Sequence, residues 1–250
     1  MNPAEFENIA RSEDRMWWYA GMRRILEAWL ERMPGERLNR VIEAGCGTGY
    51  MSGWLTRRYG WRMFPVDLSF GGLSYAKGMG LGRLTQGDIT RLPFADASCD
   101  AVVSLDVIAH LPRGLESEAF SEFWRVLRPG GKLILRASAL DVLRSRHTEF
   151  AHERQRFTAG RLRAAVEGAG FEVLDITYAN SLLLPVAWFR FRVWEPLSGG
   201  SPASGVTMPG ALMNGLLEWP LRLEAAWMRG GRRFALGQSL LVLAQKRTQA

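Results

Sequence analysis

The chain has 250 residues, of which 47% are hydrophobic and 23% charged, so it can bury a sizeable core and has no stretch that predicts disorder. Its first 15 residues mix acids and bases, so we expect no secretory signal peptide there, and its longest apolar run, at 182–189, is too short to span a bilayer. Its two cysteines, Cys46 and Cys99, give no disulfide framework and no metal-ligand spacing. We therefore expect a reduced, cytoplasmic setting and no metal ion.

The net charge of +7 is compatible with a nucleic-acid partner, an acidic substrate or an anionic membrane surface. The arginines are scattered along the chain rather than gathered in one block, which is typical of an ordinary solvated surface. We therefore expect a soluble protein that does not act on nucleic acid, with peripheral membrane contact as an alternative.

Short apolar runs alternate with helical patterns along the chain, beginning with an amphipathic helix at 19–32. Strands are predicted at 40–44, 61–66, 81–86, 99–104, 132–136, 171–178 and 239–245. Helices are predicted between them at 49–59, 115–127 and 159–169. This alternation predicts a Rossmann-like α/β fold, with a seven-stranded, mostly parallel sheet and helices on both faces.

A single domain with four parts accounts for the pattern. We expect an N-terminal helical lid at 1–38, a cofactor-binding core at 39–179, an insertion at 180–236 and the final strand and tail at 237–250. The insertion breaks the βα rhythm, because it holds four tryptophans, five prolines and a Gly/Ser-rich loop. We expect it to form a cap over the ligand-binding edge of the sheet.

A glycine-rich turn follows the first predicted strand. Gly45, Gly47 and Gly49 allow the backbone to turn sharply and to approach a ligand closely. A dinucleotide fingerprint requires glycine where this chain has Tyr50. Glu43, two residues before the first glycine, favours a cationic ligand such as S-adenosylmethionine (SAM), with its sulfonium and ammonium groups, over a pyrophosphate.

Acidic residues follow the next strands at the same edge. Asp67 ends the second strand about 20 residues beyond the turn, where a carboxylate can accept both ribose hydroxyls of SAM or of NAD. Asp88 follows the third strand, where it can accept the adenine amino hydrogens while Ile89 packs on the ring, or can serve only as a turn aspartate. The fourth strand ends at the same edge with Asp106.

These motifs occur in order as E-x-G-x-G-x-G, the aspartate of the second strand, G-D-x-x-x-L-P-F, D-x-V-x-S and L-R-P-G-G-K-L. Over residues 40–178 they resemble the class I SAM-dependent methyltransferases, in the subgroup that acts mostly on small molecules (type 11). The resemblance implies SAM as cofactor, S-adenosylhomocysteine (SAH) as product, and a cofactor site. The residues expected to form that site are Tyr19, Glu43, Gly45, Cys46, Gly47, Gly49, Asp67, Leu68, Asp88, Ile89, Ser104, Leu105 and Asp106.

The three histidines, His110, His147 and His152, are predicted in loops after the fourth and fifth strands, at the ligand edge. Histidine suits proton transfer near neutral pH, although a loop histidine is often only structural. The stretch 145–157 also resembles an S-x-H-D…H-x-R-R-Y pattern of bacterial methyltransferases, many of them tailoring enzymes of glycan, lipid or secondary metabolism. We expect His152 to be the general base of an O-methylation, followed by His147 and His110.

That bacterial subgroup also has aromatic residues near its start, as in Trp17, Trp18 and Tyr19. These aromatic side chains form either a lid over SAM or a hydrophobic staple for the first helix. The apolar and basic stretch at 181–192 either lines a greasy acceptor pocket, lies in a membrane interface or packs the cap onto the sheet.

Competing functions lack their own motifs. The N/D-P-P-Y/F motif of amino-methylating DNA enzymes is absent at Ser104–Val107, and neither cysteine forms the Pro-Cys nucleophile of the ring-carbon type. An RNA or protein methyltransferase remains an alternative, as do a SAM-fold binding protein without activity and an NAD-dependent dehydrogenase. The acceptor, the atom that is methylated and the oligomeric state are not predicted.

Overall fold

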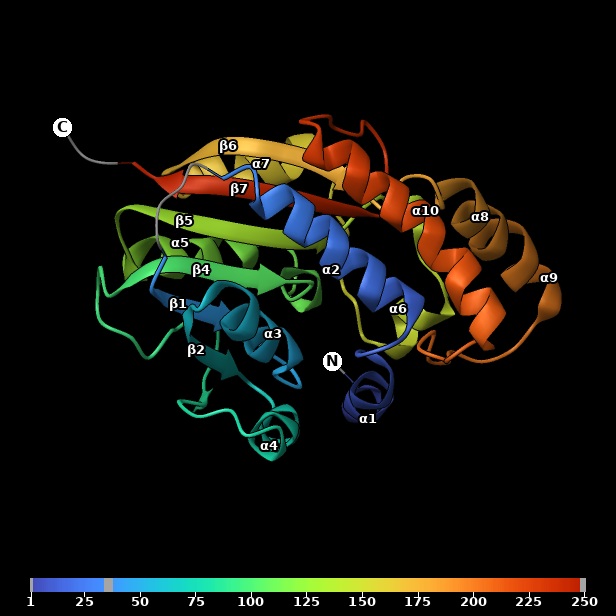
Figure 1. The fold of residues 1–250 in the computed structure, drawn as a ribbon, viewed down its shortest axis with the longest axis horizontal. Helices are drawn as coiled ribbons and strands as arrows, with labels where there is room; N and C mark the ends of the chain where they lie inside the picture. Colours follow the sequence, from blue (N-terminus) through green and yellow to red (C-terminus); the bar gives the residue numbers. More distant parts are fainter. Residues whose placement is uncertain (1, 34–37, 248–250) are drawn as a thin grey trace.

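The computed structural model describes residues 2–33 and 38–247. Within these residues, seven strands form one sheet in the order β3-β2-β1-β4-β5-β7-β6 (Figure 1). Strand β7 is antiparallel to both of its neighbours, and the other paired strands are parallel. The predicted α/β fold with a mostly parallel sheet is confirmed. The strands are β1 (Arg40–Ala44), β2 (Arg62–Asp67), β3 (Thr85–Gln86), β4 (Cys99–Leu105), β5 (Leu127–Ser138), β6 (Phe171–Ala179) and β7 (Ser239–Lys246).

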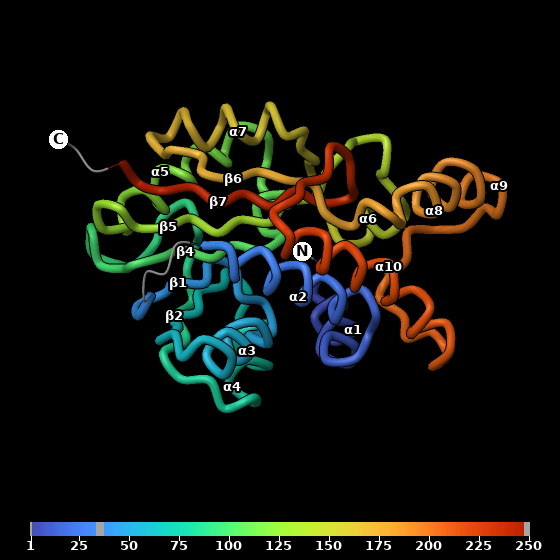
Figure 2. The backbone as a smooth tube through the Cα atoms, turned by 45° about the horizontal axis from the view of Figure 1, so that its top comes forward, coloured from blue at the N-terminus to red at the C-terminus, as the bar shows by residue number. Residues whose placement is uncertain are grey.

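Helices cover both faces of the sheet (Figures 1 and 2). Helices α2 (Trp17–Leu30), α3 (Tyr50–Tyr59) and α10 (Ala211–Arg229) bury apolar side chains against one face, with Trp29 and Leu221 among them. Helices α5 (Glu116–Val126) and α7 (Ala159–Gly168) cover the other face through residues such as Phe120 and Phe123. Burying a large apolar side chain contributes roughly 1.5–3 kcal/mol, so these two layers hold the sheet edge in place.

Several local elements differ from the predictions. The strand predicted at 81–86 is limited to β3, because the chain turns before it, with left-handed backbone at Gly80 and Arg83. Before β4, two helices were missed, α1 (Pro3–Ser12) and α4 (Phe70–Gly78). Helix α1 is mostly polar and starts from Asn2, whose side chain accepts a hydrogen bond from Ala4 N, whereas α4 contains three glycines that disguise a helical pattern.

The insertion between β6 and β7 is helical. It contains α8 (Leu184–Phe189), the π-helical turn η3 (Arg190–Trp194), α9 (Glu195–Ser198) and α10, with the predicted Gly/Ser-rich loop between α9 and α10. Helix α10 lies along α2, whereas α8 and α9 extend beyond the end of the sheet (Figures 1 and 2). The boundaries of the lid, core, cap and tail stay a prediction, and residues 34–37 and 248–250 of the lid and tail lie outside the described residues.

A search of the described residues for a helix both long and apolar enough to cross a bilayer finds none.

Candidate functional site

The glycine turn lies between β1 and α3, at the point where the chain first crosses to β2 on one side and later returns to β4 on the other. Ligands of open α/β sheets bind at such a reversal of strand order. Gly45 and Gly49 have φ of +86° and +79°, and a Cβ at Gly45 would lie 2.3 Å from Val107 Cγ2. These glycines therefore let the turn pack against its neighbours without a side chain.

Asp67, at the end of β2, holds the glycine turn. Its Oδ2 accepts a hydrogen bond from Gly47 N at 2.7 Å, and its Oδ1 accepts one from Ser69 N at 2.8 Å. Burial raises the pKa of this half-buried carboxyl. The structure thus brings Asp67 and the glycines together, as expected for a site that fixes the ribose beside the turn.

Glu43 lies beneath the turn rather than on its open side. Its carboxyl is fully buried and accepts a hydrogen bond from the Ser52 hydroxyl of α3. Burial, opposed by that hydrogen bond, raises the pKa of Glu43 to about 8. The group is therefore largely protonated at neutral pH in the absence of a nearby cation. Its predicted contact with a cationic ligand stays a prediction.

Helix α1 and the residue that follows it cover the glycine turn. The Thr48 hydroxyl donates to the Glu13 carboxyl at 2.7 Å, and burial raises the pKa of Glu13 to about 7. Phe6 is buried between the turn and α4. A Cβ at Gly47 of the turn would lie 3.9 Å from Phe6 Cε1, and one at Gly72 of α4 would lie 2.8 Å from it. Sequence reasoning missed Glu13 and Phe6, because no motif connects the turn to residues so far from it in the sequence. Glu13 and Thr48 are 35 positions apart.

The end of β4 contributes Asp106, which has left-handed backbone and forms an ion pair with Arg136 of β5 at 2.6 Å. The Arg136 guanidinium lies 5.2 Å above the Trp18 ring, so the start of α2 is joined to this edge. Ser104 is fully buried, and its hydroxyl donates to Ala44 O at 2.9 Å. The Ser104 side chain thus joins β4 to β1, and Arg136 is a further residue that the sequence did not predict.

Tyr19 lies in the first turn of α2, with its ring at 5.0 Å from that of Trp18 in an edge-on arrangement. Burial, followed by the carboxylates of Glu13, Glu5 and Asp106, raises the pKa of Tyr19. The phenol therefore stays protonated, near the carboxylates of Glu5, Glu13 and Asp106.

The remaining predicted cofactor residues face in different directions. Asp88 is exposed, and its Oδ1 accepts hydrogen bonds from Thr90 N and Thr90 Oγ1 at 2.8 and 2.9 Å. Ile89 is 6% exposed and packs into the core, whereas Leu68 is 68% exposed beside Asp67. Leu105 is half-buried, and burial raises the pKa of the buried Cys46 thiol. A flat ligand beyond Asp67 thus has Leu68 as its available apolar neighbour.

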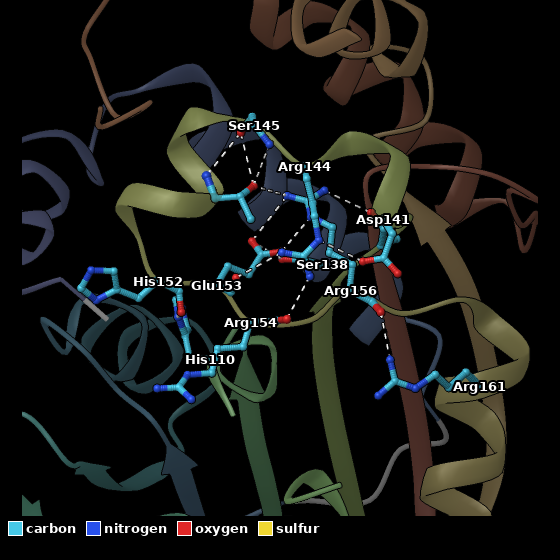
Figure 3. A network of polar contacts seen from close by, with 12 residues as sticks. His110, Ser138, Asp141, Arg144, Ser145, His152, Glu153, Arg154, Arg156 and Arg161 are labelled. Carbon is cyan, nitrogen blue, oxygen red and sulfur yellow. Dashed lines mark hydrogen bonds and ion pairs between the residues drawn. The ribbon is translucent and has the colours of Figure 1, made fainter. Parts of the chain in front are cut away.

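Two of the histidines lie on short helices, which corrects the prediction of loops (Figure 3). His110 ends the 3-10 turn η1 (Ile108–His110), and its Nδ1 lies 3.3 Å from His152 O. His152 has left-handed backbone and an exposed ring that points away from the polar network of Figure 3. His147 lies on α6 (Arg146–Phe150), where Ser145 and Thr148 form a capping box.

His147 connects three segments. Its Nδ1 accepts a hydrogen bond from Gly205 N at 3.0 Å and lies 3.6 Å from Glu5 Oε1. Because Nδ1 accepts, the proton of the neutral ring lies on Nε2, and burial also lowers the pKa of His147. The Ser204 hydroxyl donates to Glu5 at 3.0 Å, so the lid, α6 and the cap loop meet at this histidine.

The segment after β5 is held by polar contacts that the sequence did not reveal (Figure 3). Glu153 forms an ion pair with Arg156 at 2.7 Å, and Gln155 Nε2 donates to Leu111 O and Glu116 at 3.1 Å. Thr148 stands where the bacterial pattern has aspartate and Gln155 where it has arginine, and both have structural partners here. The segment that carries His152 is therefore firmly placed next to η1.

A surface depression of about 230 Å³ lies elsewhere, at the far end of α3, and shares no residue with the glycine turn. Its lining residues include Thr56, Trp61 and Arg83. The site is therefore defined by its chemistry at the sheet edge rather than by this depression.

Comparisons with known proteins agree with this geometry. Residues 42–135 match the family profile described as "Methyltransferase domain". The methyltransferase GfsG of Streptomyces halstedii is 27% identical over 199 residues, covering 74% of this chain and 68% of that protein. A malonyl-[acyl-carrier protein] O-methyltransferase of Enterobacter lignolyticus is 35% identical over 122 residues, covering 48% of this chain and 47% of that protein.

The chain spans about half the length of most of the curated relatives it matches. Among solved structures, a chain from the complex of the Trm112 methyltransferase activator of Haloferax volcanii with a methyltransferase superimposes with a TM-score of 0.62. It is 23% identical, and the match covers 99% of this chain and 95% of that one. With the glycine turn and the acidic residues at the sheet edge, these matches support a class I, Rossmann-like SAM-dependent methyltransferase of the type 11 subgroup.

Proposed function

We propose that the chain transfers a methyl group from SAM to a hydroxyl oxygen of a small or lipid- or glycan-like metabolite. The observation that carries the proposal is the hydrogen bond between Asp67 and Gly47 N, which joins a ribose-binding carboxylate to the glycine turn at the switch point. SAM supplies an electrophilic methyl group on a sulfonium when it is bound.

The residues at this edge fit SAM better than a dinucleotide. The Asp67 carboxylate beside the turn would repel a pyrophosphate and attract a sulfonium or an ammonium. Such a cation would also favour the ionised forms of Glu13 and Glu43, whose pKa values burial raises. The cofactor contacts proposed are those with the glycine turn and with Tyr19, Asp67, Leu68 and the Ser104–Asp106 strand end. Asp88 and Ile89, which follow β3, are proposed as further contacts.

Among the three histidines, the hydrogen-bond geometry favours His110 as the base. A carbonyl oxygen can only accept, so the contact with His152 O places the proton of His110 on Nδ1 and leaves Nε2 free to take one. Burial lowers the pKa of His110, which keeps the ring neutral near pH 7. His110 takes the proton of the acceptor hydroxyl at Nε2 as the oxygen gains the methyl group.

The other two histidines have different parts in this proposal. His152 ranked first from the sequence, but its exposed ring has no partner to fix it, and its backbone carbonyl orients His110. His147 positions the lid against the cap loop. The relatives named as malonyl-[acyl-carrier protein] O-methyltransferases support oxygen as the acceptor atom.

Calorimetric titration with SAH, with NAD as a parallel control, tests the cofactor. Micromolar binding of SAH alone is expected, and preference for NAD contradicts the proposal. A screen with methyl-labelled SAM against lipids, phenols and glycans then identifies the acceptor and provides the turnover assay.

Two variants then test the base. His110→Ala is expected to lower kcat about a hundredfold while SAH affinity is kept. His152→Asn, which tolerates the left-handed backbone and keeps the carbonyl, is expected to change kcat by less than about threefold. The reverse order of effects would return the role to His152.

A further inference from the structure

Helix α10 exposes a long apolar face to solvent, although it is a surface helix, and buries two carboxyl groups among its inward apolar residues. Its inward face, against α2 and the sheet, contains Glu218, Leu221, Glu224, Ala225 and Met228. Its outward face carries a row of large apolar side chains. These are Leu212, Leu216, Trp219, Leu223 and Trp227, exposed between 42 and 89%.

The outward residues form one stripe. Their spacing of three or four positions places them on one side of a helix with 3.6 residues per turn, opposite the buried positions. The stripe spans 16 residues from Leu212 to Trp227, which is about 22 Å of helix. Isolated exposed apolar residues are normal, but a contiguous row of this length marks an interaction surface.

A second group of exposed apolar residues lies at the same end of the molecule, on α8, η3 and α9 (Figures 1 and 2). It comprises Val186, Trp188, Phe189, Trp194 and Leu197. Arg190 and Arg192 are exposed among them. We call this group and the α10 stripe together the cap surface.

The charges of the cap that have no ion-pair partner among the described residues are positive. Residues 180–236 contain six arginines and three glutamates. All three glutamates are occupied, because Glu218 pairs with Arg24 and Arg222, Glu224 is fully buried, and Glu195 accepts from Arg146 N. Arg222, Arg229 and Arg233 are also ion-paired. The positive charge that the cap presents to solvent therefore comes from the other three arginines, Arg190, Arg192 and Arg232.

We propose that the cap surface docks the enzyme onto an anionic lipid bilayer, without crossing it. Tryptophan and arginine beside leucine and phenylalanine are the composition of segments that lie in the headgroup region, where rings are buried and guanidinium groups meet phosphates. Arg232 stacks on Trp227 at 4.2 Å, so one such pair is already formed at the end of the stripe.

The same observations disfavour a second copy of the chain as the occupant. Two copies facing one another through the cap surface would bring arginines against arginines, with the cap's acids already paired or buried. An anionic membrane offers the opposite charge over the whole area. This inference does not depend on the methyl transfer proposed above.

Co-sedimentation with vesicles tests the proposal. The wild-type chain is expected to sediment with vesicles of phosphatidylcholine and phosphatidylglycerol (3:1) and much less with phosphatidylcholine alone, and to be released by high salt. The double variant Leu216→Glu/Trp219→Glu is expected to weaken binding about tenfold or more. Arg190→Gln/Arg192→Gln is expected to reduce the preference for the anionic vesicles.

A matched control places the same kind of change outside the cap, at Met79→Glu/Leu115→Glu, where both side chains are exposed. It is expected to bind vesicles as the wild type does. All three double variants are expected to keep the SAH affinity of the wild type, which separates docking from cofactor binding. Wild-type chain that stays in the supernatant, or an equal loss in the control, overturns the proposal. A wild-type dimer that Leu216→Glu/Trp219→Glu dissociates, without vesicle binding, assigns the surface to a second copy instead.

Discussion

The sheet edge and the cap are built on opposite principles. At the edge, apolar side chains such as Ile42 and Val102 face inward, and polar groups gather where ligands bind. In α10 of the cap, carboxyl groups face inward and leucine and tryptophan face solvent. Folding alone explains the arrangement at the sheet edge. The exposed apolar row of α10 does not contribute to folding, so it points to a surface that is covered by something outside the chain.

Two buried acids hold the cap in addition to the apolar residues that α10 packs against α2. Glu224 Oε1 accepts from Leu182 N at 2.6 Å, which ties α10 to the segment after β6, and Glu218 accepts from Arg24 of α2 at 3.0 Å. Burial raises the pKa of Glu224. Its Oε1 can accept the Leu182 N–H in the protonated and in the ionised form, so the hydrogen bond does not depend on the charge of the group. The inward face of α10 therefore combines apolar packing with polar anchors.

The largest expected effect tests the packing of the edge. Gly45→Ala places a Cβ 2.3 Å from Val107 Cγ2 on a backbone with φ of +86°. Strain and overpacking together are expected to lower the free energy of unfolding by about 3 kcal/mol. Urea denaturation measures this, and a loss below about 1 kcal/mol would mean that the turn is looser than described.

The second effect concerns the ligand. Asp67→Ala removes the acceptor of Gly47 N and the carboxylate proposed to hold the ribose. SAH affinity is expected to fall about a hundredfold or more, or about 2.7 kcal/mol. Titration calorimetry measures it, with Asp14→Ala in the exposed lid as control. Unchanged SAH binding by Asp67→Ala would remove that residue from the site.

The third effect uses the buried acid of the core. The pKa of Glu43 is raised to about 8 in the folded chain, so the folded state binds more protons than the unfolded state above pH 4.5. Its stability contribution is full below that pH and is lost as the pH rises towards 8, at up to about 1.4 kcal/mol per pH unit. Glu43→Gln is expected to flatten this slope in denaturation curves between pH 5 and 8. A slope equal to that of the wild type contradicts the assignment.

Much of the edge could be predicted because its signals are local. The glycine turn, Asp67 and the order of strands follow from spacing and from the chemistry of single residues. The lid contacts could not be predicted, since Thr48 and Glu13 meet only through the tertiary fold. The sequence ranked His152 first as the base, whereas the proposal favours His110. The reason is again tertiary, because the contact that leaves His110 Nε2 free to accept a proton is with His152 O, 42 residues away.

The cap shows a different limit of sequence reasoning. Apolar residues of α10 recur at helical spacing on two sides, at 221, 225 and 228 and at 212, 216 and 219. Periodicity identifies both stripes but does not say which one faces the core. The partners of Glu218 and Glu224 decide it, and these partners are distant in sequence.

The smallest expected effect separates the two regions once more. Gly215 lies in the exposed part of α10, where an added Cβ meets nothing within 4 Å, in contrast to Gly45. Gly215→Ala is expected to raise the free energy of unfolding by about 0.5–1 kcal/mol, because alanine is the better helix former. Vesicle binding and SAH affinity should be unchanged. A destabilisation would mean that the chain packs against this face of α10 itself, and the cap would then have less free surface to offer a membrane.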